Sequence, residues 1–394
     1  MSPSILEIIS TGLARLRKLP APICFTVYLF SCAGATAAWG RSAADLDEQV
    51  SRAESFNINA EDNRFELLGD FEGTTIIFKV YDSSGAIRGA LKLPSAVSNY
   101  LGEIAAHKIA RFLGITIFPA TVYKTLDGAT AIRLENILQA KVYNTKRKDH
   151  HKRGIENKEK NRLEALRRLK ADETPDGCFK EWVKNIQFVS EIGTRKALGA
   201  HELMQYLKAD GPRAPKGTMV LKQCTYLMSE KGCFTGTIEW SRLVQDMSDM
   251  MLVDALSGNL DRFPGGNIHM RSLDGRAQRT GKGVYYPRAE LLALDNGATF
   301  MGDPARNLDD LTGRRLASIK VERFAKGRYE KLLELRELAR KDPAGTRQRF
   351  FLRRFAHSSG VTIDMLAQFN ANLEGVIDYM RLNSEQYGSR AVLP

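Results

Sequence analysis

Two short loops carry the side chains of this chain that are best suited to chemistry. The first contains Asp261 and Asn267, and the second begins with Asp295 at the end of a short apolar run. Glycines punctuate both loops, and the apolar residues before each loop would bury its stem. Phosphoryl transfer uses this combination, because one Asp orients the attacking hydroxyl while an Asn and a second Asp hold metal ions on the nucleotide phosphates. We therefore predict Asp261 as the catalytic base and Asp295 and Asn267 as metal ligands.

Other residues could hold a nucleotide against these loops. Lys92 lies at a strand end between apolar neighbours, and Glu103 on the following helix could pair with it and fix it on the phosphates. Lys79 is the competing lysine, but the shorter run from Lys92 to the helix favours Lys92. Gly69 and Gly73 would let a turn cover the phosphates with backbone N–H groups. The expected cofactors are ATP and Mg²⁺ or Mn²⁺, since hard cations take oxygen ligands.

The residue pattern before the first loop predicts a small, β-rich lobe. Alternating and β-branched residues predict strands over 65–81 and 90–93, and apolar residues at helical spacing predict a helix over 99–113. A further hairpin is expected from 122–123 and 131–134 around an Asp-Gly turn. Strands with one helix, followed mostly by helices, is the order of a two-lobed α+β protein.

The second half reads as a mostly helical lobe. An amphipathic helix over 241–256 leads to the Asp261 loop, a polar hairpin or excursion fills 271–288, and a buried strand over 289–294 ends on Asp295. Three other acids are expected on the surface of the helix over 241–256 or as its caps: Asp246, Asp249 and Asp254. Further helices are expected at 307–324, 326–341, 344–357 and 361–383.

These elements divide the chain into five segments. They are a signal peptide or membrane anchor (1–38), a linker or first helix (39–62), the small lobe (63–140), a basic insertion with the inter-lobe region (141–215) and the large lobe with both loops (216–394).

The first segment has the pattern of a secretory signal. Arg15, Arg17 and Lys18 precede an apolar stretch that ends in small residues near Ala38. Polar residues dilute this stretch, and it is short for a spanning helix. We expect a secreted, periplasmic or secretory-lumen protein that meets a membrane only through this segment. An uncleaved anchor is the alternative.

Positive charge characterises the whole chain, which has a formal net charge of +12. Lys and Arg are densest over 141–172, which we interpret as a solvated or partly disordered helical insertion, with a docking surface for an acidic partner as the alternative. We do not expect nucleic acid as a partner, because no aromatic stacking platform accompanies the charge.

With these residues in view, the chain resembles the four-jointed / Golgi casein kinase family of secretory-pathway atypical kinases. The resemblance lies in Arg88–Pro94, in Gly102–Gly114, and in the pair Gly258–Arg262 and Leu294–Gly297, which follow one another in the family's order. HipA-like and CotH-like kinases are similar more distantly. The resemblance implies a kinase-like fold of two lobes, and a secretory signal as in several members.

Carried over residue by residue, the resemblance implies Lys92 as a phosphate ligand, Glu103 as its partner, Asp261 as the base and Asp295 as a metal ligand. The chain departs from the family in two ways. The interval between Asp261 and Asp295 is longer than usual, which indicates an inserted hairpin at 271–288. The three cysteines beyond the first segment, Cys178, Cys224 and Cys233, are too few for the family's disulfides. Cys224 and Cys233 flank a plausible hairpin and could pair, which would leave Cys178 over.

Three functions fit the sequence. The first is an ATP-dependent kinase that phosphorylates a hydroxyl, either Ser/Thr of a protein or a hydroxyl of a glycan. The net positive charge favours acidic substrates. The second is a catalytically silent nucleotide-binding or scaffold protein. The third is an adhesion or nucleic-acid-binding module that works through 141–172.

Overall fold

The computed structural model describes part of one unit of the chain, Gly40–Pro394. The described residues are 42–68, 75–95, 98–141, 152–171, 175–184, 186–225, 232–259, 261–263, 267–273, 276–280, 283–300, 308–309, 311–313, 319–351, 355–356 and 362–393. The predicted signal segment and the predicted phosphate-covering glycines, Gly69 and Gly73, lie outside them. Within these ranges no helix is both long and apolar enough to cross a membrane.

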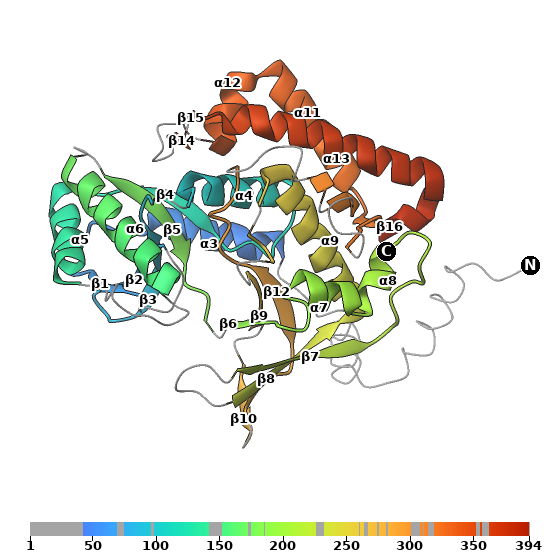
Figure 1. The fold of residues 1–394 in the computed structure, drawn as a ribbon, viewed down its shortest axis with the longest axis horizontal. Coiled ribbons are helices and arrows are strands. Elements are labelled where there is room, and N and C mark those ends of the chain that lie inside the picture. Colours follow the sequence, from blue (N-terminus) through green and yellow to red (C-terminus); the bar gives the residue numbers. More distant parts are fainter. Residues whose placement is uncertain are drawn as a thin grey trace, which may run out of the picture. The chain divides into compact units, whose positions relative to one another are not determined.

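An antiparallel sheet of five strands forms the small lobe (Figure 1). Its strands follow the order β1-β2-β3-β5-β4 and span Arg64–Leu67, Ile77–Tyr81, Ile87–Lys92, Asp176–Glu181 and Thr121–Thr125, respectively. The strands predicted on either side of the glycine-rich turn are confirmed as β1 and β2. Residues 176–181, which the sequence placed in the inter-lobe region, pair with both β3 and β4. This register sets Lys92 opposite Cys178.

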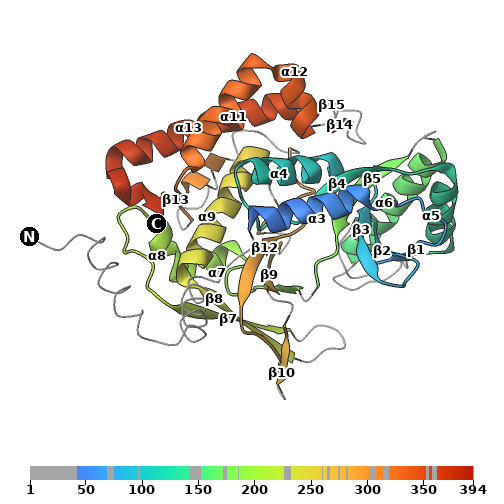
Figure 2. The same cartoon turned by 180° about the vertical axis from the view of Figure 1, so that it is seen from behind.

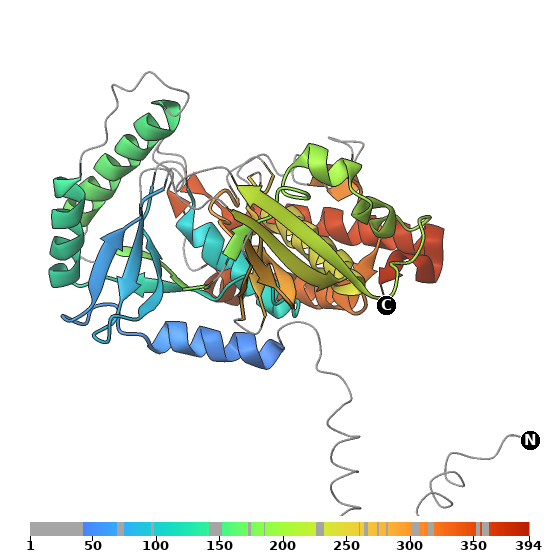
Figure 3. The same cartoon turned by 90° about the horizontal axis from the view of Figure 1, so that it is seen from below.

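Three helices pack around this sheet: α3 (Ala43–Ser55), α5 (Gly128–Ala140) and α6 (Lys152–Ala171). The hairpin predicted at 131–134 is wrong, because these residues lie in α5. Asp127 begins this helix by accepting a hydrogen bond from the Thr130 N–H at 2.7 Å. The two helices α5 and α6 lie together beside the sheet (Figure 3).

The basic insertion is a packed helix where the structure describes it. Ala165 and Leu169 of α6 are buried in the same hydrophobic cluster as Leu134 and Leu138 of α5. Arg162 adds a hydrogen bond of 2.9 Å to the Leu138 carbonyl. The charged side chains of α6 that the structure describes therefore surround an apolar stripe that holds the helix to the small lobe.

The large lobe is built around α9 (Trp240–Ser257), which α4 (Tyr100–Phe112) and α13 (Met365–Tyr387) both contact (Figures 1 and 2). The helix predicted over 241–256 is confirmed as α9, but almost every described side chain in it is buried, so it is a core helix rather than an amphipathic one. The other described helices of the large lobe are α7 (Arg195–Ala200), α8 (Leu203–Leu207), α11 (Arg328–Lys341), α12 (Pro343–Thr346), the π-helical turn η1 (Arg347–Phe351) and the 3₁₀ turn η2 (Gly388–Ala391).

Short sheets complete the large lobe. One contains β10 (Gln278–Thr280), β11 (Gly283–Tyr286), β8 (Gly232–Glu239) and β7 (Thr218–Thr225), and another β12 (Ala289–Ala293), β9 (Ile268–Ser272) and β6 (Ile186–Phe188). Two-stranded pairs join β13 (Phe324–Ala325) to β16 (Val392–Leu393) and β14 (Phe355–Ala356) to β15 (Thr362–Ile363). The hairpin expected within 271–288 is present as β10 and β11. Cys224 and Cys233 are opposite one another in the register of β7 and β8, and their pairing stays a prediction.

Two helix predictions need correction. Residues 324–325, at the end of the predicted helix 307–324, form β13, and the predicted helix 344–357 is divided among α12, η1 and β14. The fold class is confirmed as α+β, with a sheet-rich first lobe and a mostly helical second one. Each lobe has its own apolar core.

Helix α4 belongs to the core of the large lobe. Its buried apolar residues, which include Leu101, Ile104 and Ile109, join the same cluster as α9 and α13. The strands β2 and β3 belong to the other cluster. A contact between β3 and α4 therefore links the two lobes.

Candidate active site

A row of four charged side chains of alternating sign joins the two lobes. Lys92 at the end of β3 contacts Glu103 of α4 through Nζ and Oε1, and the same ammonium is 2.8 Å from Oδ1 of Asp295. Lys180 of β5 lies 2.6 Å from the other oxygen of Glu103. Lys92 is 4% exposed and Glu103 is 1% exposed. Because both are buried, each needs the opposite charge beside it.

The charges of this row stabilise one another. Burial disfavours the charged Lys92, but the carboxylates of Asp295 and Glu103 outweigh it and raise the pKa of this lysine above its ordinary value. Burial also disfavours an ionised Asp295, yet Lys92 holds the pKa of its carboxyl below the ordinary value. Both groups are therefore charged at neutral pH.

The start of α4 is tied to the loop that follows β12. Asn99 caps the helix by accepting a hydrogen bond from the Gly102 N–H at 3.0 Å, and its own N–H donates to the Gly297 carbonyl at 2.6 Å. A Cβ on Gly297 would lie 2.6 Å from Lys92 Nζ and would clash with Ser98 Oγ. Glycine is therefore needed at 297 for the loop to approach the Lys92–Glu103 pair this closely.

Asp295 itself has an unusual backbone, with φ at 45°. Side chains other than Asn, Asp and Gly rarely adopt this left-handed conformation, and such strain gathers at functional sites. One carboxylate oxygen contacts Lys92, and the side chain is 42% exposed. Asp295 can therefore present its second oxygen to a ligand.

The loop after α9 positions Asp261. Helix α9 ends at Gly258, whose φ of 66° turns the chain away, and the Asn259 side chain then accepts the Asp261 N–H at 3.1 Å. Asn267 Nδ2 donates to the Asp261 carbonyl at 3.0 Å. Partial burial and the negative charge of Asp295 raise the pKa of Asp261, and Lys92 and Arg262 oppose this shift. Asp261 therefore lies within the electric field of the charged row.

Arg262 connects the two loops and α9. Its guanidinium forms two parallel hydrogen bonds with Asp254, at 2.8 and 2.9 Å. It also donates to the carbonyls of Asn267 and Leu294, at 2.9 and 2.8 Å, and to the Asn296 side chain. Such a planar fork, fully buried, fixes the spacing between both loops.

The expectation that the other acids of α9 lie on its surface or at its caps is wrong. All three are buried: Asp246 is 1% exposed, Asp249 4% and Asp254 7%. Each pairs with an arginine, Asp246 with Arg242, Asp249 with Arg328 and Asp254 with Arg262. The helical i,i+4 spacing of Arg242 and Asp246 was an available signal for the first pair, whereas no spacing rule joins Arg262 to Asp254 or Arg328 to Asp249.

A cavity of about 410 Å³ opens beside the charged row. Apolar side chains from both lobes line most of it, including Ile77, Ala90, Trp182, Ile186 and Leu294. Lys92, Glu103, Lys180 and Asp295 line it as well. An apolar slot with a few charged groups is typical of a ligand site, and here it suits a flat ring with an anionic tail.

The residues present also suit a hard metal ion. Asp295 has a carboxylate oxygen that Lys92 does not use, and Asn267 donates through Nδ2, which leaves its amide oxygen for a cation. Oxygen ligands of this kind are those of Mg²⁺ and Mn²⁺. In the described part of the chain, no cluster of three His, Cys, Asp or Glu side chains could hold a metal ion alone. Phosphate oxygens and water would have to supply the other ligands.

No protein-family model and no curated protein sequence matches the chain. Among solved structures, the chain is similar to the Golgi casein kinase (TM-score 0.48, 12% identity, 87% of this chain and 78% of that chain). It is also similar to the Golgi casein kinase with Mn/ADP bound (0.46, 12%, 88% and 78%) and to hydra Fam20 with sugar (0.44, 16%, 90% and 93%). At such identities and TM-scores, the chemistry of this chain has to be derived from its own residues.

Proposed function

We propose that the protein is an ATP-dependent kinase that transfers the γ-phosphoryl group to a hydroxyl. The observation that best supports this function is the meeting of Lys92, Glu103 and Asp295 at the wall of an apolar cavity between the lobes. Phosphoryl transfer requires positioning and charge neutralisation more than covalent chemistry, and this arrangement supplies both.

Each part of the cavity then has a role. The apolar walls take the adenine ring, and the ammonium groups of Lys92 and Lys180 contact the phosphates. Asp295 and Asn267 would hold Mg²⁺ or Mn²⁺, which neutralises charge on the phosphates when bound. Asp261 orients the acceptor hydroxyl and accepts its proton, for which its raised pKa suits it.

The acceptor that we propose is a Ser or Thr hydroxyl of an acidic protein, with a glycan hydroxyl as the alternative. A net charge of +12 attracts anionic substrates and raises their rate of encounter. Labelling of casein-like peptides and of free glycans in parallel would separate these acceptors.

Asp295→Asn tests the proposed function directly. We expect transfer of labelled γ-phosphate from ATP to an acidic peptide to fall about a thousandfold, because loss of one metal-binding carboxylate removes several kcal/mol of charge stabilisation. Asp378→Asn is the matched control, since that carboxylate is 67% exposed on α13. Equal labelling by wild type and Asp295→Asn would refute the role of Asp295. Nucleotide binding without transfer to any acceptor would favour a silent nucleotide-binding protein.

Lys180, which the sequence did not single out, should contribute to nucleotide binding. We expect Lys180→Met to raise the KM for ATP about tenfold, the size of one charge-assisted hydrogen bond to a phosphate. Lys79→Met is the control, because Lys79 lines the same cavity but lies 3.7 Å from Glu66 instead of contacting Glu103. Steady-state kinetics at varied ATP would measure both. A KM that rises equally in the two variants would show that Lys180 has no specific role.

A further inference from the structure

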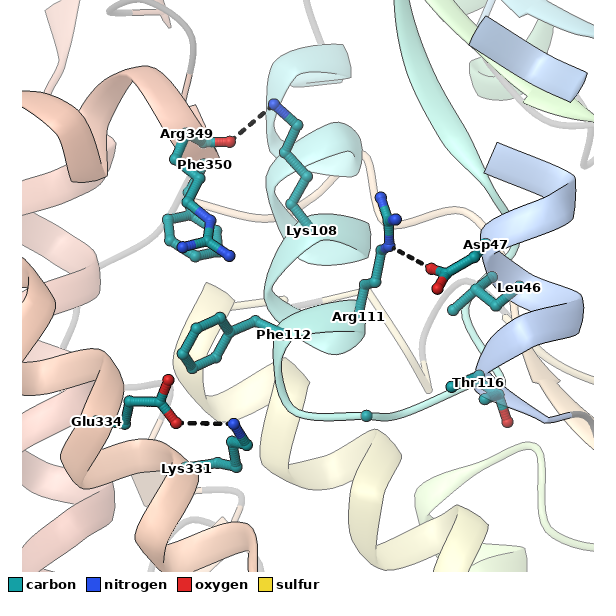
Figure 4. Close-up of a pocket in the computed structure, with 12 residues that line it drawn as sticks. Leu46, Asp47, Lys108, Arg111, Phe112, Thr116, Lys331, Glu334, Arg349 and Phe350 are labelled. Atoms are coloured by element: carbon teal, nitrogen blue, oxygen red, sulfur yellow. Dashed lines mark hydrogen bonds and ion pairs between the residues drawn. The ribbon is translucent and has the colours of Figure 1, made fainter. Parts of the chain in front are cut away.

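A second cavity, of about 530 Å³, lies at the opposite end of α4 from Glu103 (Figure 4). Side chains from α3, α4, α11 and η1 surround it. No residue of the proposed active site lines it. Its size is that of a small-molecule site.

Positive charge dominates its walls. Four cationic side chains and two carboxylates line the cavity: Lys108, Arg111, Lys331 and Arg349, with Asp47 and Glu334. Arg111 pairs with Asp47 at 2.8 Å, and Lys331 pairs with Glu334 at 2.7 Å (Figure 4). Each carboxylate therefore has its own cation, and two positive charges remain.

A hydrogen bond links Lys108 and Arg349, the residues that carry these two charges. Lys108 Nζ donates to the Arg349 carbonyl at 2.8 Å. The Arg349 guanidinium lies over the rings of Phe112 and Phe350, 5.3 and 5.4 Å from their centroids. No carboxylate within the described ranges forms an ion pair with either residue.

The lowered pKa of Lys108 indicates that nearby carboxylates only partly compensate its positive charge. Burial lowers the pKa of its ammonium, and the negative charge of Glu54 only partly offsets this effect. An anion beside Lys108 would restore the pKa towards its ordinary value.

We propose that this cavity is a binding site for a phosphate group, carried by free phosphate or by a small organic phosphate. A phosphate dianion matches the two positive charges that lack a carboxylate. The guanidinium of Arg349 can bind two phosphate oxygens at once, and Lys108, which lines the same cavity, adds a point charge.

This site is independent of the proposed kinase function but shares α4 with it. Lys108 and Arg111 lie in the later turns of the helix whose first turn carries Glu103. A phosphate bound in the second cavity would therefore contact the helix that positions the Lys92–Glu103 pair.

Equilibrium dialysis of the full chain against labelled inorganic phosphate, with a chelator present, tests the proposal. We expect wild type to bind one phosphate, and Lys108→Gln and Arg349→Gln each to weaken binding about tenfold. Lys341→Gln is the matched control, because this lysine lies on α11, is 79% exposed and does not line the cavity. Lys180→Met should also bind as wild type does, since it alters only the first cavity.

Three results would overturn the proposal. They are unchanged binding in both Lys108→Gln and Arg349→Gln, an equal loss in Lys341→Gln, and a loss in Lys180→Met alone, which would place the phosphate in the first cavity. Repeating the dialysis with phenyl phosphate in place of inorganic phosphate distinguishes an organic phosphate from free phosphate as the ligand. Tighter binding of phenyl phosphate assigns the site to organic phosphates, and equal binding assigns it to free phosphate.

Discussion

Asp261→Asn should lower kcat by about a hundredfold to ten-thousandfold and leave the dissociation constant for ATP unchanged. The amide has the shape of the carboxylate but cannot accept the proton of the acceptor hydroxyl. The backbone bonds that hold this loop, from the Asp261 N–H to Asn259 and from Asn267 to the Asp261 carbonyl, do not involve the replaced group. Single-turnover phosphate transfer and equilibrium nucleotide binding would separate the two effects.

The pH dependence offers a second measurement of the same role. Only the ionised carboxylate can accept a proton, so activity falls as pH drops through the pKa of Asp261. Because burial and Asp295 raise this pKa, the fall should come at a higher pH than for a free Asp, whose pKa is about 3.9. Residual activity of Asp261→Asn should lack this acidic limb. An identical limb in both proteins would contradict the assignment.

Arg262→Met should lower the free energy of unfolding by about 3–5 kcal/mol, the usual result of breaking a buried ion pair from one side. Met keeps much of the aliphatic volume, but Asp254, which is 7% exposed, loses its guanidinium partner. The carbonyls of Asn267 and Leu294 also lose a donor. Urea denaturation followed by fluorescence would measure the loss.

An exposed ion pair gives the matched comparison. Arg381 pairs with Glu385 at 2.8 Å on the exposed surface of α13, so Arg381→Met should leave the free energy of unfolding nearly unchanged. The double variant Arg262→Met with Asp254→Leu should recover part of the lost stability, since both buried charges are then gone. If Arg262→Met and Arg381→Met cost the same, Arg262 does not join the loops as the geometry indicates.

Local patterns in the sequence were enough to predict most of the elements that carry the site. The patterns over 65–81 and 90–93, and helical spacing after Asn99, predicted the strands and the helix that hold Lys92 and Glu103, although β3 begins three residues earlier than predicted. The apolar run before Asp295 predicted β12. These features depend on neighbours within a few residues, so propensity and periodicity record them. The hairpin predicted at 131–134 failed because the Asp127 cap and helical spacing prevailed over a turn-like Asp-Gly pair.

The sequence by itself determined which residue types were available for phosphoryl transfer, and in what order along the chain. Only the tertiary structure decided which of them meet: it joined Lys180 to Glu103, Arg262 to Asp254, and the Gly297 carbonyl to the cap of α4. It also gathered Lys108 and Arg349 at one cavity. These partners are 8 to 241 residues apart along the chain. Burial selects such contacts, because a charge removed from water requires a partner, and no local rule specifies which one it will find.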